Sequence, residues 1–388
     1  MGARHLVLAA AMALAVGAVE NPAAAQDDQR WRAHFTAGEE ARQAGNHAKY
    51  ADEMAAAADA LPAGALNRPS VQYQAARASA LAARTSDAVT WLARAWEERI
   101  EPLMISFAEH DPAFASMKDD PGFLEVMGRA ETMELGVRHL GGSVHLITGA
   151  GANVVAHVSG EGAFLVDTGY RPAIWALRGV LAELGNDDVS HLLVTHAHED
   201  HMGSAAELGG DAVVFAHPGT ASAMAQPYNF MQGVDLPPKG PGASPDVLIS
   251  RDTTLVIGGE VVRMMPTVAH TAGDVSVYFT ESKVAHLGDA FLTGNEMMFP
   301  GQLDPDGFLD ALEAFVDDMD PATVVVPGHA DVADVETVRA QIATTRACMA
   351  FVRAALEDGK GIEQTAIEGM ERFPPQWIAF FYGLFSRG

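Results

Sequence analysis

Residues 192–204 read "LLVTHAHEDHMGS", in which three histidines and an aspartate fall within six positions directly after an apolar run. A packed core can satisfy one buried histidine, but rarely three beside a carboxylate. On an extended segment the period of two puts His196 and His198 on the same side, so that they can share one metal ion. Asp200 and His201 fall where the chain turns into a helix and aim at a neighbouring point. The stretch therefore predicts a second ion beside the first.

Three further candidate ligands follow other apolar runs downstream. His270 stands in "PTVAHTAGD", Asp289 in "VAHLGDAF" and His329 in "VVVPGHAD". Asp289 and His329 come directly after glycine, which lets the backbone approach a ligand site closely. Each residue alone would be an ordinary polar group, but together with the histidine-rich turn they predict a shared metal centre.

The order of these motifs resembles the metallo-β-lactamase superfamily over roughly residues 137–358. The chain has "VDTG" upstream of "THAHEDH", and "AHT", "GDA" and "PGH" follow in that order. The resemblance implies an αββα sandwich with a binuclear site at one edge between its sheets. It implies that one metal is held by His196, His198 and His270 and the other by Asp200, His201 and His329, that Asp289 bridges them, and that Asp167 of "VDTG" orients the motif from behind the ligands.

The bridging position separates classes within this superfamily. An aspartate such as Asp289 is what glyoxalase-II-like and other general hydrolases carry there, whereas dedicated β-lactamases usually have cysteine or serine. Two Zn²⁺ ions suit the nitrogen and oxygen donors, and the same set would also accept iron or manganese. Two ions that share one water lower its pKa from about 16 towards 7, so a metal-bridging hydroxide is the expected nucleophile. Asp200 and Asp289 are the candidate catalytic residues, as acceptors or relays of a proton.

Substrate contacts are expected on two segments near the motifs. Residues 223–245 lie between predicted core strands and offer Tyr228 and Phe230, and the segment after Asp289 offers Met298. Ordinary packing of these loops onto the sandwich explains them equally well. No cluster of lysine or arginine stands near the motifs, which disfavours phosphodiester and glutathione-carboxylate substrates. We therefore expect a small-molecule ester, thioester, lactone or lactam.

Around these motifs the chain alternates short apolar runs with helical stretches. "VHLITG", "VVAHVSG" and "AFLVDTG" are β-prone runs punctuated by glycine, which is typical of an antiparallel meander. A helix with one apolar face is predicted over residues 171–185. A second group of strands precedes a helix that we expect to be capped by Asp306. Strands in two groups, each flanked by helices, predict an α+β layered domain over residues 136–388, with C-terminal helices.

Residues 26–135 have a different, alanine-rich pattern. Residues 35–62 favour two short helices broken at Gly45, and residues 69–98 repeat that arrangement with a break near Thr85. Small residues where the helices would cross resemble tetratricopeptide-type repeats. We expect this all-α domain to offer a docking surface for a partner protein, with a plain helical bundle as the alternative.

The first 25 residues predict a secretory signal peptide. A basic start precedes an apolar stretch over residues 6–19, and small residues favour cleavage after Ala25. An uncleaved anchor is the alternative; no other segment is long and apolar enough to cross a membrane. The only cysteine, Cys348, excludes an intramolecular disulfide. The sequence predicts a periplasmic or secreted protein without a membrane span after signal cleavage.

Charge limits the partners of this protein. The formal net charge is -26 at pH 7. Because phosphate binding depends on lysine and arginine, we expect no nucleic-acid partner.

Three alternatives to a binuclear hydrolase follow from the same residues. The first is a mononuclear iron oxygenase of the same superfamily that acts on sulfur compounds, and the second is a β-lactamase. The third is a non-catalytic scaffold whose repeats bind a partner while the metal domain is structural. Structural zinc sites are usually saturated by protein ligands, and this set reserves no group to close the site, which argues against the scaffold.

Overall fold

The structure is a computed structural model that describes residues 22–65, 67–98, 108, 111–129, 133–231, 234–268, 270–293 and 304–386. For residues 22–29, 228–231 and 234–235 only the backbone is described. The chain divides into two compact units. One holds the described residues before Met133 together with a short hairpin near residues 229–236, and the other holds the rest of the chain. The finer domain limits given above stay predictions.

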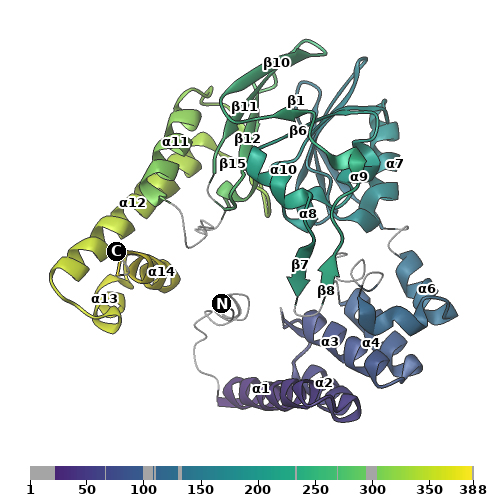
Figure 1. Ribbon diagram of the computed structural model, residues 1–388. Helices are drawn as coiled ribbons and strands as arrows, with labels where there is room; N and C mark the ends of the chain where they lie inside the picture. The colour runs from purple at the N-terminus through teal and green to yellow at the C-terminus, as the bar shows by residue number, and fades with distance from the viewer. Residues whose placement is uncertain are drawn as a thin grey trace. The chain divides into compact units, whose positions relative to one another are not determined.

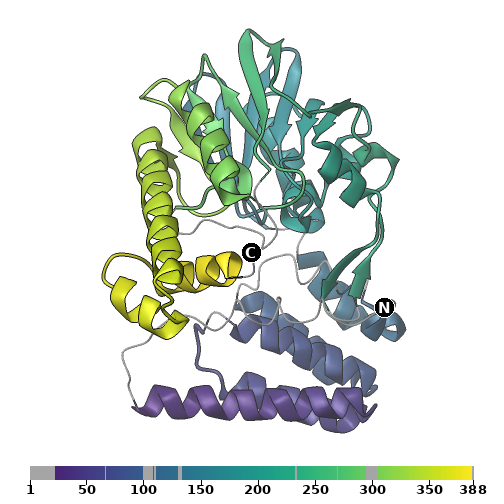
Figure 2. The same ribbon diagram turned by 60° about the vertical axis from the view of Figure 1, so that its left-hand side comes forward.

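The first unit is helical. Its elements are α1 (Pro22–Gln43), α2 (His47–Ala60), α3 (Arg68–Leu81), α4 (Thr85–Glu97), η1 (Pro112–Met117) and α6 (Pro121–Gly128). The chain turns between α1 and α2 at Gly45, whose φ of +70° suits a residue without Cβ. Helices that follow one another pack together, with α1 against α2 and α3 against α4 (Figure 2). The predicted helical region and both of its breaks are confirmed, whereas its assignment to tetratricopeptide-type repeats stays a prediction.

The second unit contains two sheets (Figure 1). The first runs in the order β1 (Gly136–Gly141), β2 (Val144–Thr148), β3 (Val154–Ser159), β4 (Gly162–Val166), β5 (Val189–Leu193), β6 (Val213–Ala216) and β9 (Val247–Leu248). Strands β1 to β4 form the expected antiparallel meander, and β4, β5, β6 and β9 pair in parallel.

The second sheet runs in the order β10 (Thr253–Ile257), β11 (Glu260–Pro266), β12 (Val275–Phe279), β13 (Val284–His286), β14 (Val324–Val326) and β15 (Ala333–Asp334). Its pairs are antiparallel apart from β13 with β14. A separate hairpin, β7 (Tyr228–Met231) with β8 (Val234–Leu236), lies in a segment where no strand was predicted.

Helices cover both outer faces of this pair of sheets. They are η3 (Arg171–Ala173), α7 (Ile174–Leu184), α8 (Glu199–Met202), α9 (Ala205–Leu208), α10 (Pro218–Met224) and η4 (Pro241–Ala243) along the first half, and η5 (Gly288–Ala290), α11 (Pro305–Asp317), α12 (Val335–Glu357), α13 (Ile362–Gly369) and α14 (Pro375–Phe385) along the second. Figure 1 shows α7 on one side of the paired sheets and α11 on the other. Helices α11 and α12 lie side by side (Figure 2).

Three buried clusters hold these layers together. The middle one joins the facing sides of the two sheets, with Phe164 and Phe279 fully buried in edge-to-face contact. The outer two pack α7 against the first sheet, and α11, α12 and α14 against the second. Burying a side chain such as Phe164 contributes about 1.5–3 kcal/mol relative to leaving it exposed. Three apolar clusters separate four layers, so the predicted α+β sandwich with helices outside is confirmed.

Two local features complete the description. The cap of α11 is Asp304, whose carboxylate accepts a hydrogen bond from the backbone N–H of Asp306, so the predicted cap at Asp306 is wrong by two positions. Pro305 explains the shift, because its fixed φ and missing N–H suit the first position of a helix. Among the described residues, no helix combines the length and the apolar character of a membrane span.

Candidate metal centre

All the predicted ligands lie at or just beyond the ends of strands at one edge of the paired sheets. The chain leaves β5 extended through His196 and His198 and then enters α8, which carries Asp200 and His201. Each of the other three ligands also follows a strand: His270 follows β11, Asp289 sits in η5 after β13, and His329 follows β14. The structure therefore brings together every predicted ligand, in one group of four and one group of three.

Three imidazoles and one carboxylate form the first group: His196, His198, His270 and Asp289. The Nδ1 atom of His198 lies 3.0 Å from Nε2 of His196 and 2.9 Å from Nε2 of His270. Burial, together with the neighbouring imidazoles, lowers the pKa of His270 to about 4 and holds the pKa of His196 well below its ordinary value. Neutral imidazoles present lone pairs, which is the form in which histidine binds a metal.

One carboxylate and two imidazoles form the second group: Asp200, His201 and His329. The Oδ2 atom of Asp200 lies 3.0 Å from Nε2 of His329 and 3.6 Å from Nε2 of His201. Burial disfavours protonation of His201, but the carboxylates of Asp200 and Asp167 outweigh it and raise its pKa well above the ordinary value. The second group therefore already attracts positive charge.

Asp289 lies between the two groups and is almost fully buried. Its Oδ2 atom is 3.5 Å from Nε2 of His270 and 3.9 Å from Nε2 of His196. Its Oδ1 atom is 3.4 Å from Nε2 of His201 and 3.6 Å from Nε2 of His329. Burial opposes ionisation of this carboxyl, yet the imidazoles around it hold its pKa well below the usual range. One oxygen thus faces each group, as a bridging carboxylate requires.

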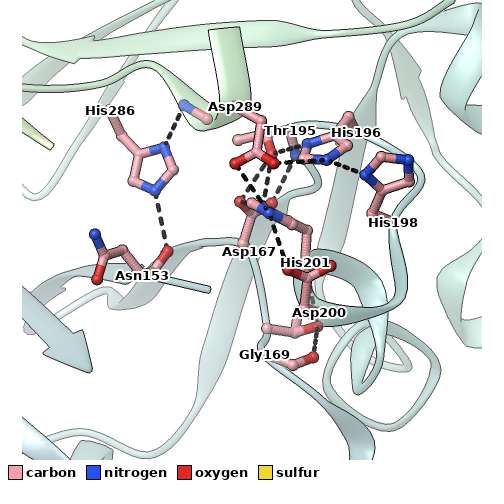
Figure 3. A network of polar contacts seen from close by, with 12 residues as sticks. Asn153, Asp167, Gly169, Thr195, His196, His198, Asp200, His201, His286 and Asp289 are labelled. Atoms are coloured by element: carbon pink, nitrogen blue, oxygen red, sulfur yellow. Dashed lines mark hydrogen bonds and ion pairs between the residues drawn. The ribbon is translucent and has the colours of Figure 1, made fainter. Parts of the chain in front are cut away.

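Asp167 fixes the orientation of the second group from behind. Its Oδ2 atom accepts a hydrogen bond from Nδ1 of His201 at 2.7 Å, which leaves Nε2 of that ring facing the centre. The backbone N–H and the hydroxyl of Thr195 also donate to this carboxylate, at 2.7 and 2.8 Å (Figure 3). Asp167 adopts a φ of +64°, an uncommon conformation for a residue with a side chain. Its position agrees with the predicted role behind the ligands.

Two buried polar atoms at the centre indicate whether a cation fits there. Neither Nε2 of His201 nor Oδ1 of Asp289 has a hydrogen-bond partner among the described residues. Leaving such groups unpaired is costly, and a bound cation would satisfy both. Around a four-coordinate Zn²⁺, ligand atoms lie roughly 3.3 Å apart, because Zn–N and Zn–O bonds are about 2.0–2.1 Å. The spacings above bracket that value, so the residues fit a pair of divalent cations.

A buried ion pair beside the motif was not predicted. Nζ of Lys239 lies 2.7 Å from Oε1 of Glu199, the residue between His198 and Asp200, and both side chains are largely buried. Burial raises the pKa of Glu199, and Lys239 opposes that rise. Sequence patterns do not indicate this pair, because Lys239 stands 40 positions from Glu199 in a loop rich in proline and glycine.

The predicted substrate contacts are not described as side chains. Tyr228 and Phe230 lie in β7, of which only the backbone is described. Met298 lies outside the described residues. All three stay predictions.

Comparison with known proteins places this site in a family context. Residues 147–329 match the model of the metallo-beta-lactamase superfamily. The hydroxyacylglutathione hydrolase of Acidiphilium cryptum (strain JF-5) is 30% identical over 176 residues, which are 45% of this chain and 62% of that relative. The chain therefore matches less than two thirds of the length of that curated relative.

Two solved structures are similar to this chain to different degrees. The sec-alkylsulfatase Pisa1 from Pseudomonas sp. superposes with a TM-score of 0.50 at 18% identity, covering 66% of this chain and 51% of that chain. A metallo-beta-lactamase from Pontibacter korlensis is 25% identical with a TM-score of 0.44, covering 54% of this chain and 98% of that chain. The resemblance inferred from the motifs is confirmed over the matched residues.

Proposed function

We propose that this chain, whose residues 147–329 form a metallo-β-lactamase superfamily domain, is a hydrolase that uses two divalent cations to cleave a carbonyl bond in a small molecule. The observation that carries the proposal is the position of Asp289. Its two oxygens face different ligand groups, so this one carboxylate would help to hold both cations. Zn²⁺ is the cation that we expect, with iron and manganese as the alternatives.

Bound cations would supply Lewis acidity and would lower the pKa of a water molecule, which would provide a nucleophile at neutral pH. The side chains around them set the direction of approach. His196 and His201 are fully buried, whereas His329 is about one third exposed and Asp200 is partly exposed. A substrate therefore reaches the centre from the side of His329 and Asp200.

Asp200 is the residue that we propose as the proton acceptor during attack. Its Oδ2 atom lies on this open side, 3.0 Å from Nε2 of His329, which stabilises the ionised carboxylate. Burial opposes ionisation, but the neighbouring imidazoles lower the pKa of Asp200 below its ordinary value. A carboxylate at this position can take the proton of the attacking water and pass it to the leaving group.

An acyl thioester is the first substrate class to test, because a hydroxyacylglutathione hydrolase is among the relatives. Esters, lactones and lactams use the same attack on a carbonyl and form the rest of the class. Lys239 does not supply a free charge for an anionic substrate, since its ammonium group is paired with Glu199.

The complete second ligand group favours this proposal over a mononuclear iron oxygenase. Asp200, His201 and His329 offer ligand atoms that all lie within 4.8 Å of one another. Aspartate at the bridging position favours it over a dedicated β-lactamase. We further propose, from the sequence of the first 25 residues, that the protein acts in the periplasm or outside the cell, and that its helical unit docks a partner protein. Fractionation of cells expressing the full chain tests the location.

The experiment that tests the function uses the full chain, stripped of metal with a chelator and reloaded with Zn²⁺, Mn²⁺ or Fe²⁺. Each form is assayed against thioester, ester, lactone and lactam substrates, including a chromogenic cephalosporin. We expect turnover of at least one class to appear as the second equivalent of cation binds. Activity that survives complete metal removal would contradict the proposal, as would binding of a single iron with oxygen-dependent activity.

A matched control for these assays is Asp246→Asn. Asp246 accepts a hydrogen bond from the backbone N–H of Val214 at 2.9 Å, between β6 and β9 in the same unit, and it is not among the ligands. This substitution removes a structural carboxylate without touching the centre. We expect it to retain both cations and full turnover.

A further inference from the structure

A pair of buried polar residues lies beside the centre without contacting the candidate cations. Asn153 immediately precedes β3 of the first sheet, and His286 is the last residue of β13 in the second. Asn153 is 5% exposed and His286 is fully buried. Figure 3 shows the imidazole of His286 directed at the backbone oxygen of Asn153.

Asn153 donates hydrogen bonds to the loop that carries His329. Its side-chain Nδ2 donates to the backbone oxygens of Pro327 and Ala330, both at 2.9 Å, and its backbone N–H donates to the oxygen of Gly328 at 2.8 Å. These acceptors flank His329 on both sides. Ala330 has a φ of +70°, so the loop is held in a conformation that residues with a side chain seldom adopt. Three hydrogen bonds from one residue thus fix the backbone around a candidate ligand.

His286 accepts a hydrogen bond from the loop that carries Asp289. Its Nδ1 accepts a hydrogen bond from the backbone N–H of Gly288 at 3.0 Å. Because Nδ1 accepts, the proton of the neutral ring sits on Nε2, which donates to the backbone oxygen of Asn153 at 3.0 Å. Both ring nitrogens therefore have hydrogen-bond partners in one tautomer. The ring thus connects the loop that carries Asp289 to the first sheet.

The two loops also contact each other directly. The backbone N–H of Gly328 donates to the oxygen of Gly288 at 2.8 Å. A Cβ built on Gly328 would stand 1.9 Å from Oδ1 of Asp289, so no other residue fits beside that carboxylate without a shift. The position of one loop consequently depends on the position of the other.

We infer that Asn153 and His286 are positioning residues for the centre, which set the Asp289 and His329 loops against each other and so determine how tightly the second cation is held. The inference rests on the two-cation centre proposed above and adds two residues that are not among the candidate ligands. Groups that orient metal ligands from behind typically change metal affinity by about 10–100-fold when they are removed.

The test is a titration of the metal-free full chain with Co²⁺, followed by its visible absorption, for the parent protein and for Asn153→Ala. We expect two binding steps in the parent. His329→Ala identifies the step that belongs to the second group. In Asn153→Ala that step should weaken by about 10–100-fold, while the first step is retained. The unfolding temperature of the metal-free protein is measured alongside, because a merely structural role would lower it without separating the two steps.

A second pair of variants tests the positioning role of His286. His286→Phe keeps a buried ring and removes both hydrogen bonds, and we expect it to weaken both steps, because Asp289 faces both groups. His286→Gln keeps a donor that can reach Asn153 and should recover part of that loss. His157→Phe is the matched control: His157 is another buried histidine, in β3 of the first sheet, stacked on Phe279 and not among the ligands. It should bind both cations as the parent does.

The possible outcomes separate this inference from the proposed function. If the parent binds fewer than two Co²⁺ ions, the two-cation centre itself is wrong. If the parent binds two and Asn153→Ala binds both with unchanged affinity, the positioning role alone is wrong. If Asn153→Ala fails to fold, the His286 variants decide: equal affinities in His286→Phe and the parent would overturn the inference.

Discussion

The two ligand groups of the centre differ in charge and in exposure. The first offers three imidazoles whose pKa values are lowered by burial and by neighbouring imidazoles of the centre, so it presents neutral nitrogen donors. The second contains Asp200 and two histidines whose pKa values are raised, because nearby carboxylates outweigh the effect of burial. His329 is also about one third exposed, whereas His196 is fully buried.

This difference assigns distinct tasks to the two groups. A set of neutral nitrogens around the fully buried His196 is expected to hold a cation firmly. A partly exposed set with a carboxylate keeps an open side, where a cation, a proton acceptor and an incoming substrate can meet. Asp289 couples the two, so changes at either group are expected to reach the other through this residue.

The largest effect is expected at the shared residue. Asp289→Ala removes a ligand from both groups and leaves the imidazoles of His201 and His270 without the carboxylate between them. Turnover should fall by far more than the roughly 10–100-fold that follows loss of a group which only orients a ligand. Metal content and turnover of the purified variant check this. A variant that keeps two cations and normal turnover would show that Asp289 does not couple the two groups.

Removing one histidine from each group should separate their tasks. His329→Ala is expected to lose the second cation and nearly all turnover while it retains the first. His270→Ala should weaken the first cation, since it removes one of three converging imidazoles. Equilibrium dialysis with Zn²⁺ followed by elemental analysis distinguishes the two. Identical losses in both variants would mean that the groups do not act separately.

A smaller effect on cation binding is expected from Asp167, which lies behind the ligands. Asp167→Asn replaces an acceptor of the His201 Nδ1–H by an amide, so the ring is held less firmly. Affinity for the second cation should drop by about 10–100-fold, with the first cation retained. Asp246→Asn serves as the control in the same titration. Equal affinities in Asp167→Asn and the parent would show that His201 needs no support from this carboxylate.

The smallest effect on the centre is expected from the buried pair next to it. Lys239→Met leaves the carboxylate of Glu199 buried without its partner, which should lower the free energy of unfolding by about 3–5 kcal/mol. The double variant Lys239→Met with Glu199→Gln removes both charges and should recover much of that loss. Denaturant unfolding measures both, and dialysis checks that two cations still bind. If Lys239→Met instead loses a cation at unchanged stability, the pair belongs to the metal site.

Much of the centre could be predicted from the sequence, because its ligands belong to short sequence patterns. The alternation of His196 and His198 and the position of every other ligand at a strand end follow from patterns of a few residues. The alternating apolar runs likewise indicated two sheets flanked by helices, and the helical breaks at Gly45 and before Thr85 carried ordinary turn signals.

Apart from Asp167, the residues behind the ligands carry no such signal. His286 and Asn153 are 133 positions apart. His286 stands in the stretch that carries Asp289, but nothing in the sequence distinguishes it or Asn153 as a partner of the ligand loops. Lys239 sits in a loop whose composition predicts only turns. These contacts arise from the packing of the sheets, and a single sequence without that packing offers no reason to pair them. The hairpin β7–β8 was missed for a related reason, because its strands are short and follow no alternating pattern.

The central claim is that one carboxylate serves two cations in this chain. The electron paramagnetic resonance spectrum of the full-length protein loaded with two equivalents of Mn²⁺ tests it most directly. We predict the spectrum of an exchange-coupled pair, which is lost in Asp289→Ala. A spectrum of isolated Mn²⁺ ions in the parent protein, or saturation at one Mn²⁺ per chain, would contradict the account.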